Sequence, residues 1–228
     1  MTGHQGKIHM AAHSHHFWPD IAKEGHMLAY EISSQQSDQK WEYAFNELIP
    51  QVQSLISKHL SFSRPKDIAF APNTHDLITK LISDKLTETK NIRILTTTKE
   101  FHSINRQLTR LNEHAQFEII QLDPESQNLN NQLIETLTKQ SFDFIFFSHV
   151  FFNSGKVLGE SSIKTIIEYK RNARFILDGY HHYCAIPFDL SPYENDLYYI
   201  AGGYKYAQSG EGMCFMTLPR NCQIRPLI

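Results

Sequence analysis

Arg174-Phe175-Ile176-Leu177-Asp178-Gly179-Tyr180-His181 and Tyr199-Ile200-Ala201-Gly202-Gly203-Tyr204-Lys205 are the two stretches that decide the fold. Each contains a short apolar run followed by glycine, which predicts a buried strand and then a turn. The first stretch delivers a carboxylate at the end of its strand, Asp178, and the second delivers an amine, Lys205. Taken singly, these residues are ordinarily a turn aspartate and a surface lysine. Together, at the ends of consecutive strands, they predict a reactive site.

Strands and helices alternate along the rest of the chain. Strands are predicted at 68–70, 92–96, 117–122, 143–148, 174–178 and 199–203, and a last, antiparallel strand at 212–218. Helices are predicted at 38–59, where Pro50 should kink or split the helix, after Asn73-Thr74, and at 101–112, 129–138 and 160–171. Because several strands are apolar on both faces, the pattern predicts an α/β fold with three layers, a mostly parallel sheet flanked by helices.

Polar residues follow five of the predicted strands. They are Asn73-Thr74, Phe101-His102-Ser103, Ser148-His149, Asp178 with His181, and Tyr204-Lys205. In open α/β sheets, ligands bind beyond the carboxyl ends of the strands, which lie at one edge. We therefore expect these residues to form one binding site.

An aspartate and a lysine held in this way supply two contacts that pyridoxal 5'-phosphate (PLP) needs. The carboxylate keeps the pyridine nitrogen protonated, and the amine forms a Schiff base with the aldehyde. Asn73-Thr74 either only caps a helix or, at the helix N-terminus, helps to bind the phosphate. Phe101 is either a core aromatic or a ring that stacks on the cofactor, and Ser148 and Tyr204 add hydroxyl donors. His181 is either a plain loop histidine or a contact of the carboxylate or the cofactor.

Bulk composition narrows the class of protein. With 228 residues the chain has room for one large domain or one and a half ordinary ones, and its 41% hydrophobic and 20% charged residues are typical of globular proteins. A net charge of −2 gives no reason to expect nucleic acid or an anionic membrane as partner, and no apolar run reaches membrane-spanning length. Three cysteines are too few for a disulfide framework, which favours a reducing cytoplasm.

Motifs of several other enzyme classes are missing from the sequence. It contains no Gly-x-Gly-x-x-Gly, no Gly-x-x-x-x-Gly-Lys-[Ser/Thr] and no Gly-x-Ser-x-Gly. Cys184 and Cys214 lie in apolar surroundings, which predicts core cysteines and not a nucleophile. The N-terminal histidines (His4, His9, His13, His15, His16) do not combine a His-x-x-x-His spacing with a carboxylate, so no metal site is predicted.

The strand-end motifs resemble those of the class V, fold-type I PLP enzymes, and within them the kynureninase-like group. Gly203-Tyr204-Lys205-Tyr206 is similar to the family's Ser-Tyr-Lys-Tyr, in which the lysine holds PLP and the tyrosine reaches its phosphate. Asp178-Gly179-Tyr180-His181 resembles its Asp-x-x-His, with the aspartate on the pyridine nitrogen and the histidine beside the cofactor. Phe147-Ser148-His149-Val150 looks like its Leu-Ser-x-Val segment, whose serine contacts the cofactor.

Further positions carry the same resemblance. Thr74, with Asn73 before it, matches the phosphate-site threonine that opens a helix. Phe101 in Glu100-Phe101-His102-Ser103 matches the ring-stacking aromatic, so Phe101 and His102 are expected at the cofactor. Ala12-His13-Ser14 is similar to an N-terminal loop of the family through its serine. The resemblance implies PLP as the cofactor, Lys205 as the catalytic residue and no metal.

The resemblance also implies an organisation, partners and a reaction. We expect an N-terminal helical segment, residues 1–60, then a PLP-binding large domain of the PLP-dependent transferase type, residues 61–228, and no C-terminal small domain, because the family continues well beyond the lysine. The implied partners are a small amino-acid substrate and a second copy in a homodimer, without nucleic acid or membrane. The implied reaction is kynureninase-like hydrolysis of kynurenine to anthranilate and alanine. The alternatives are a truncated, non-catalytic PLP-binding homologue and a class V aminotransferase or cysteine desulfurase.

Overall fold

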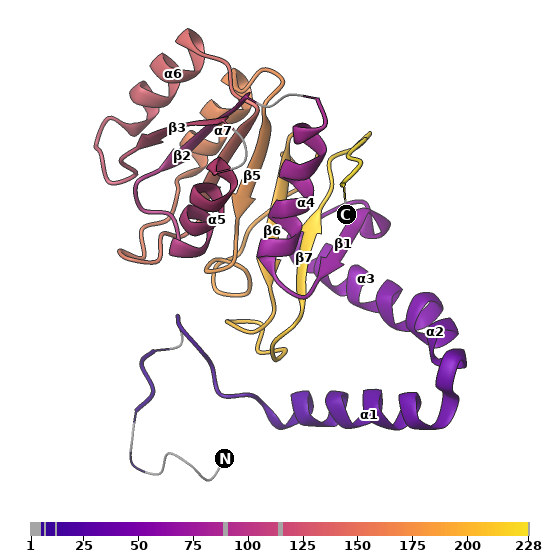
Figure 1. Cartoon of the computed structure of the whole chain (residues 1–228). Helices are drawn as coiled ribbons and strands as arrows, with labels where there is room; N and C mark the ends of the chain where they lie inside the picture. Colours follow the sequence, from indigo (N-terminus) through magenta and orange to yellow (C-terminus); the bar gives the residue numbers. More distant parts are fainter. Residues whose placement is uncertain (1–5, 7, 12, 89–90, 114–115, 228) are drawn as a thin grey trace.

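A seven-stranded sheet in the order β1-β7-β6-β5-β4-β2-β3 forms the centre of the computed structural model, which describes residues 6, 8–11, 13–88, 91–113 and 116–227 (Figure 1). The strands are β1 Ile68–Ala71, β2 Asn91–Thr97, β3 Gln116–Leu122, β4 Phe144–Ser148, β5 Arg174–Asp178, β6 Leu197–Gly202 and β7 Cys214–Thr217. Strand β7 runs antiparallel to both β6 and β1, and the remaining pairs are parallel. The predicted α/β fold, with a mostly parallel sheet and a last antiparallel strand, is confirmed.

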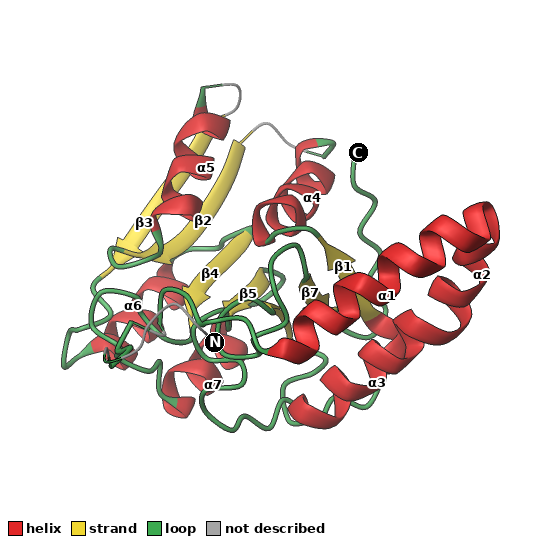
Figure 2. Ribbon diagram, turned by 90° about the horizontal axis from the view of Figure 1, so that it is seen from below, coloured by secondary structure: helices red, strands yellow, loops and turns green. Residues whose placement is uncertain are grey.

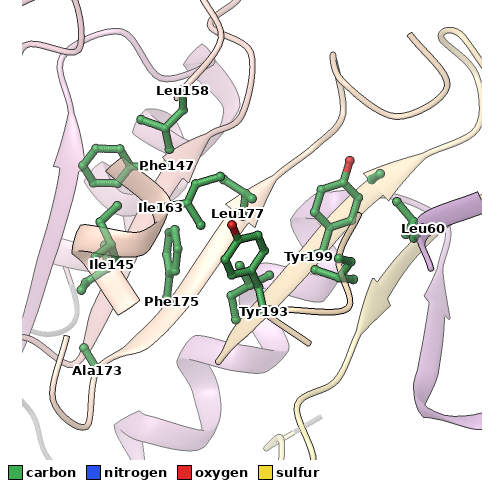
Figure 3. Close-up of a cluster of buried hydrophobic side chains, with 14 of the residues drawn as sticks. Leu60, Ile145, Phe147, Leu158, Ile163, Ala173, Phe175, Leu177, Tyr193 and Tyr199 are labelled. Carbon is green, nitrogen blue, oxygen red and sulfur yellow. The ribbon is translucent and has the colours of Figure 1, made fainter. Parts of the chain in front are cut away.

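Helices cover both faces of this sheet. Helices α4 (Thr74–Leu86) and α5 (His102–Asn112) pack on one face, and α3 (Ile49–Leu60), α6 (Leu129–Lys139) and α7 (Glu160–Tyr169) on the other. Alternate residues of a strand point to opposite faces of the sheet. Phe144 and Phe146 of β4 belong to the core with α4 and α5. Ile145 and Phe147 belong to the core with α6 and α7 (Figure 3). Burial of both faces explains why these strands read as continuous apolar runs.

A run of helical segments precedes the sheet. It consists of α1 (Asp20–Gln36), a 3-10 turn η1 (Ser37–Gln39), α2 (Lys40–Tyr43), a π-helical stretch η2 (Ala44–Leu48) and α3, with a further 3-10 turn η3 (Pro65–Asp67) before β1. The predicted break at Pro50 is present, because Pro50 lies in the first turn of α3 and the backbone widens into the π-helical stretch just before it. Both views show these helices on the side of β1, away from β3 (Figures 1 and 2).

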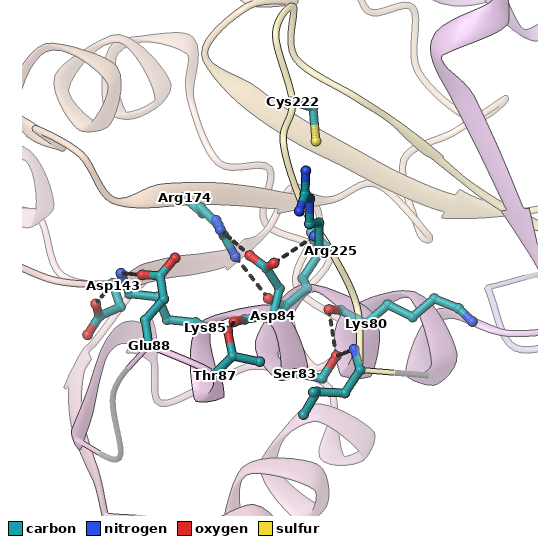
Figure 4. Close-up of polar contacts among 12 residues, drawn as sticks. Lys80, Ser83, Asp84, Lys85, Thr87, Glu88, Asp143, Arg174, Cys222 and Arg225 are labelled. Atoms are coloured by element: carbon teal, nitrogen blue, oxygen red, sulfur yellow. Dashed lines mark hydrogen bonds and ion pairs between the residues drawn. The ribbon is translucent and has the colours of Figure 1, made fainter.

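The segment after β7 is held against α4 by polar contacts. The Asp84 carboxylate accepts hydrogen bonds from the backbone N–H of Arg225 (2.6 Å) and from Arg174 Nη2 on β5 (2.5 Å), and Ser83 Oγ accepts one from Leu227 N–H (3.2 Å) (Figure 4). Burial acts to raise the pKa of Asp84, but these donors outweigh it and hold the pKa below its usual value. The last described residues therefore have a fixed position beside β5 and α4.

The three cysteines are unpaired, and they differ in exposure. Cys214 is buried, as predicted, whereas Cys184 is exposed, so its assignment to the core was wrong. The reason is its place in the turn after β5, where it adopts a left-handed backbone with φ of 64°. Among the described residues, none of the helices combines the length and the apolar character that crossing a membrane requires.

Candidate active site

A cavity of about 230 Å³ opens at the edge of the sheet where β1, β2, β5 and β6 end. Its lining comes from the turns that follow these strands and from the first turns of α4 and α5: Asn73, Thr74, His75, Phe101, Ser103, Asp178, Tyr180, His181, Tyr204 and Lys205. Seven of the nine residues predicted for the site are among them. The expected convergence of strand ends therefore produces one cavity.

Lys205 is the buried amine of this cavity. Only 3% of the residue is exposed, and its Nζ donates hydrogen bonds to the backbone oxygens of His13 (2.8 Å) and Ser14 (3.3 Å). A tight turn holds it, with Gln208 N–H donating to Lys205 O (3.1 Å). Burial lowers the pKa of Lys205, and the charge of Asp178 opposes this shift. A lowered pKa increases the fraction of neutral, nucleophilic amine.

Asp178 is the acidic partner at the end of the neighbouring strand β5. Its Oδ1 accepts a hydrogen bond from Tyr180 N–H (2.9 Å), while its Oδ2 has no hydrogen-bond partner within the described ranges. Burial raises the pKa of Asp178 to about 6, against the lowering effects of the Tyr180 N–H and the Lys205 charge. The free oxygen of this half-buried carboxylate is a site for a cationic N–H donor.

Close packing between side chains and glycines joins the two strand ends. A Cβ on Gly202, after which the Lys205 turn begins, would lie 2.2 Å from Tyr180 Oη, and a Cβ on Gly179 would lie 2.1 Å from the Tyr199 ring. The glycines that end the two apolar runs are thus required for space, since their backbone φ values are not in the left-handed region. They allow Tyr180 and Tyr199 to cross between β5 and β6.

His181 lies among aromatic rings at the mouth of the cavity. Its ring centroid is 5.9 Å from that of Phe101 and 5.4 Å from that of Phe152, and its buried Nε2 has no hydrogen-bond partner in the described chain. Burial, and then the positive charges of Lys205 and His13, lower the pKa of His181 to about 4. His181 is therefore neutral at neutral pH and has a free nitrogen for a ligand.

The first turn of α4 forms part of the cavity wall. Asn73 is the helix N-cap, and its Oδ1 accepts a hydrogen bond from Asp76 N–H (2.9 Å). The cap therefore exists as predicted, and Thr74 and His75 of the first turn line the cavity. The positive end of the helix dipole and a threonine hydroxyl at this place can bind a phosphate group.

Two residues predicted at the cofactor, Ser148 and His102, do not line the cavity, and neither does His149, which was expected at the same edge of the sheet. The buried Ser148 hydroxyl donates to Glu100 Oε2 (2.5 Å), and His102 is exposed, with its ring centroid 4.1 Å from that of Phe101. Their assignment to the cofactor thus stays a prediction without geometric support. Ser103, expected at this edge of the sheet, lines the cavity, whereas sequence reasoning missed Tyr180 and His75 as lining residues, although each lies close to a residue that it selected.

The N-terminal histidines lie near the Lys205 turn. His15 and His16 contact Tyr204 and Tyr206 with ring centroids 5.4 and 5.3 Å apart, and His16 Nδ1 is 2.9 Å from Gln208 Nε2. Ser14, predicted in a family-like N-terminal loop, is thereby close to the site, while Ala12 of that motif lies outside the described residues. Within residues 6, 8–11, 13–88, 91–113 and 116–227, no group of three or more histidine, cysteine or acidic side chains is arranged to hold a metal ion.

Solved structures with a similar fold include a NifS-like protein (TM-score 0.77, 18% identity) and SspA in complex with cysteine (TM-score 0.75, 19% identity). The alignments cover 95% of this chain in both cases, and 60% and 63% of the other chains. A third is a C-DES variant with glycine covalently linked to the PLP cofactor (TM-score 0.74, 17% identity, 92% of this chain and 56% of the other). The chain thus spans about 60% of the length of the solved structures that it matches.

At these identities the likeness to solved structures shows the fold alone, and comparison with curated proteins gave no match. The family assignment comes from sequence. A family model, aminotransferase class V, matches residues 11–227, which is nearly the whole chain and includes every residue that lines the cavity. Its PLP-dependent chemistry agrees with the cofactor predicted from the strand-end motifs. This chain belongs to the class V aminotransferase family.

Proposed function

We propose that the chain binds PLP through Lys205 and acts on the α-carbon of an amino acid. The observation that carries this proposal is the convergence of a buried amine, Lys205, and a half-buried carboxylate, Asp178, in one cavity at the ends of adjacent strands. A lysine with a purely structural role ordinarily lies at the surface, because burying its amine costs free energy.

The residues of the cavity fit the chemical groups of the cofactor. Asp178 Oδ2, without a protein partner in the described chain, suits a protonated pyridine nitrogen. The first turn of α4 with Thr74 suits the phosphate, and Lys205 Nζ suits the aldehyde carbon. Phe101 presents an aromatic ring for stacking, and His181 Nε2 is a free buried polar atom. The pyridine nitrogen, the phosphate, the aldehyde and the ring face of PLP therefore each have a candidate partner.

The bound cofactor supplies an electron sink that stabilises negative charge at the substrate α-carbon. The chain's own residues position the reactants and move the proton. Lys205 Nζ would hold the cofactor and, once its amine is free, could accept the proton of the substrate Cα. Asp178 would hold a protonated pyridine nitrogen, and the rings of Tyr180 and Tyr204, 5.9 and 5.2 Å from Lys205 Nζ, shield the amine from water.

Kynurenine is the first substrate to test, because the strand-end motifs are most similar to the kynureninase-like group. The reaction would be hydrolysis to anthranilate and alanine. Cysteine is the second, because a structural neighbour is described in complex with cysteine and others are named cysteine desulfurase. By the same family resemblance we propose a homodimer in the cytoplasm.

The proposal is tested by adding PLP to the purified chain. We expect a yellow protein whose visible absorption band is removed by borohydride, with the label on Lys205 by mass spectrometry. Lys205→Ala should lose the band, and Lys164→Ala, at an exposed residue of α7 paired with Glu160, should keep it. Anthranilate release from kynurenine and sulfide release from cysteine then identify the reaction. A colourless wild-type protein that takes up no PLP would refute the proposal.

A further inference from the structure

Glu100, at the turn between β2 and α5, is a buried acid just behind the cavity. The residue is 5% exposed, and its carboxylate is surrounded by donors. Thr97 Oγ1 donates to Oε1 (2.7 Å), and both the hydroxyl (2.5 Å) and the backbone N–H (3.0 Å) of Ser148 donate to Oε2. The Thr97 hydroxyl also accepts from Lys99 N–H (3.3 Å), so its own proton points to Glu100. Three donors aimed at one carboxylate favour its ionised form.

Glu194 provides a comparison within the same chain. It is also buried, with 8% exposed, and it also accepts from the hydroxyl (2.7 Å) and the backbone N–H (2.8 Å) of one serine, Ser63. Glu194 differs because Arg64 Nη1 pairs with it at 2.7 Å. Within the described chain Glu100 has no such cation, and the charged group that acts on it is another acid, Asp178. A buried charge without a counterion is costly, so a counterion from outside the chain is the natural complement.

The position of Glu100 indicates what that counterion is. Ser148, which it binds, is the register partner of Asp178 in the parallel pair of β4 and β5, so both side chains leave the same face of the sheet. Glu100 thus lies beside the carboxylate proposed to hold the pyridine nitrogen. Burial raises the pKa of Glu100 to about 7 against the lowering effect of its hydrogen bonds, and the negative charge of the nearby Asp178 adds to the rise.

We propose that Glu100 is a positioning residue whose negative charge, together with that of Asp178, makes this end of the cavity favour a cationic ring nitrogen. This inference rests on the proposed PLP function. Above the pKa of Glu100, with Asp178 also ionised and Lys205 protonated, these three groups carry one excess negative charge, which a protonated pyridine ring would neutralise. Glu100 directly precedes Phe101 in the chain. Its hydrogen bonds with Thr97 at the end of β2 and Ser148 at the end of β4 therefore help to position the Phe101 ring, which is proposed to stack on the cofactor.

The test compares PLP with its 1-deaza analogue, in which a carbon replaces the ring nitrogen. Dissociation constants for both are measured by fluorescence titration of the full chain, as wild type and as Glu100→Gln, which keeps the shape of the side chain and removes its charge. We expect Glu100→Gln to weaken PLP binding about tenfold and to leave binding of the analogue unchanged, since a nearby charge shifts a pKa by about one unit or more. Asp178→Asn should act in the same direction, and Glu194→Gln, the matched buried acid, should change neither constant.

The outcomes separate the inference from the function on which it rests. Equal weakening of PLP and the analogue by Glu100→Gln would show a merely structural role and overturn the inference while leaving PLP binding intact. Failure of the wild type to bind PLP would overturn the proposed function itself. Should Glu100→Gln not fold, Glu100→Met serves the same comparison, because it removes the charge together with its desolvation cost.

Discussion

Gly202 shows how a single residue constrains the cavity. An added Cβ would lie 2.2 Å from Tyr180 Oη, and Tyr180 lines the cavity beside Asp178. We expect Gly202→Ala to lower the free energy of unfolding by about 1–3 kcal/mol, because the overpacked tyrosine must move, and to weaken PLP uptake. Urea denaturation and PLP titration measure the two effects.

The control for this substitution is Gly25→Ala on the helix α1. A Cβ on Gly25 meets no atom within 4 Å, and alanine is the better helix former, so a gain of roughly 0.5–1 kcal/mol is expected. A stable Gly202→Ala protein with unchanged PLP uptake would contradict the packing argument.

Residues whose role depends on local sequence could be predicted, and residues whose role depends on a distant partner could not. Asn73 was recognised as a cap because capping involves only the next helical turn, and its bond to Asp76 N–H is present. Asp178 and Lys205 were expected to lie together because each comes at or just after the end of an apolar strand, and both line the cavity. Ser148 was assigned to the cofactor, but its hydroxyl donates to Glu100, 48 residues away in the sequence. No local pattern reports such a pairing, and for the same reason Glu100 itself was not selected.

At the scale of elements, the turns after β4 and β5 meet through a stacked pair of histidines. The rings of His149 and His182 lie 3.6 Å apart at an angle of 4°, and each has a buried Nδ1 without a partner among the described residues. Burial lowers the pKa of His149 to about 3, with a further effect of His182, and that of His182 to about 4. Both pKa values lie below the ordinary value of 6.5, so the folded state keeps the two rings neutral. The free energy of unfolding is therefore fully maintained above about pH 6.5 and decreases as the pH falls below it.

The free energy of unfolding of the wild type should fall between about pH 7 and about pH 4.5. We expect His149→Phe to reduce this fall by up to a few kcal/mol, since one unit of pKa shift corresponds to about 1.4 kcal/mol. Asp178 and Glu100 act in the opposite direction, since their raised pKa values favour folding at low pH, so the difference between variant and wild type is the informative quantity. Urea midpoints at both pH values measure it. His59→Phe, at an exposed histidine, is the control, and an equal response of both variants would rule out the stacked pair as the cause.

The segment His13–His16 is the second element with a consequence for function. Its backbone oxygens hold Lys205 Nζ, and carbonyl acceptors favour the charged amine over the nucleophilic one. A chain that begins at Phe17 should therefore capture PLP faster, by a few-fold or more, in stopped-flow absorbance. Gln208→Ala, which removes the contact to His16 Nδ1 (2.9 Å), should give a smaller change in the same direction. Slower capture by both proteins would show instead that the segment helps to bind the cofactor.

The predicted strands and the helices α4 to α7 agree with the structure because their apolar residues repeat with the period of the element and are buried. Helix α1 was not predicted as a separate element, and none of its residues is buried, so no core-facing pattern marks it. The strand order, with β7 between β1 and β6, also lay beyond local pattern, because register and neighbours are set by packing of the whole sheet.

At the scale of the whole molecule, exposed apolar side chains are distributed unevenly. Most of those with the largest exposure lie before the sheet: Ile8, Met10, Trp18, Ile21, Met27, Leu28, Tyr30, Trp41, Phe45, Leu48 and Leu55. Trp41 and Phe45 stack with centroids 5.8 Å apart and remain 53% and 60% exposed. Large exposed apolar patches mark interaction surfaces in folded proteins. The helical segments from α1 to α3 are therefore the surface on which the proposed homodimer is tested.

We expect the chain to sediment as a dimer at micromolar concentration and the variant Trp41→Ser/Phe45→Ser to dissociate at least about tenfold more readily, because buried aromatic anchors dominate interface energies. Ile134→Ser, on α6 at the opposite end of the sheet and 37% exposed, is the matched control and should leave the dimer unchanged. Since the stacked pair lies outside the cavity, PLP affinity measured under monomeric conditions also tells whether the site needs the second copy. A wild-type chain that sediments as a monomer at all concentrations would contradict the dimer, and equal dissociation of both variants would place its interface elsewhere.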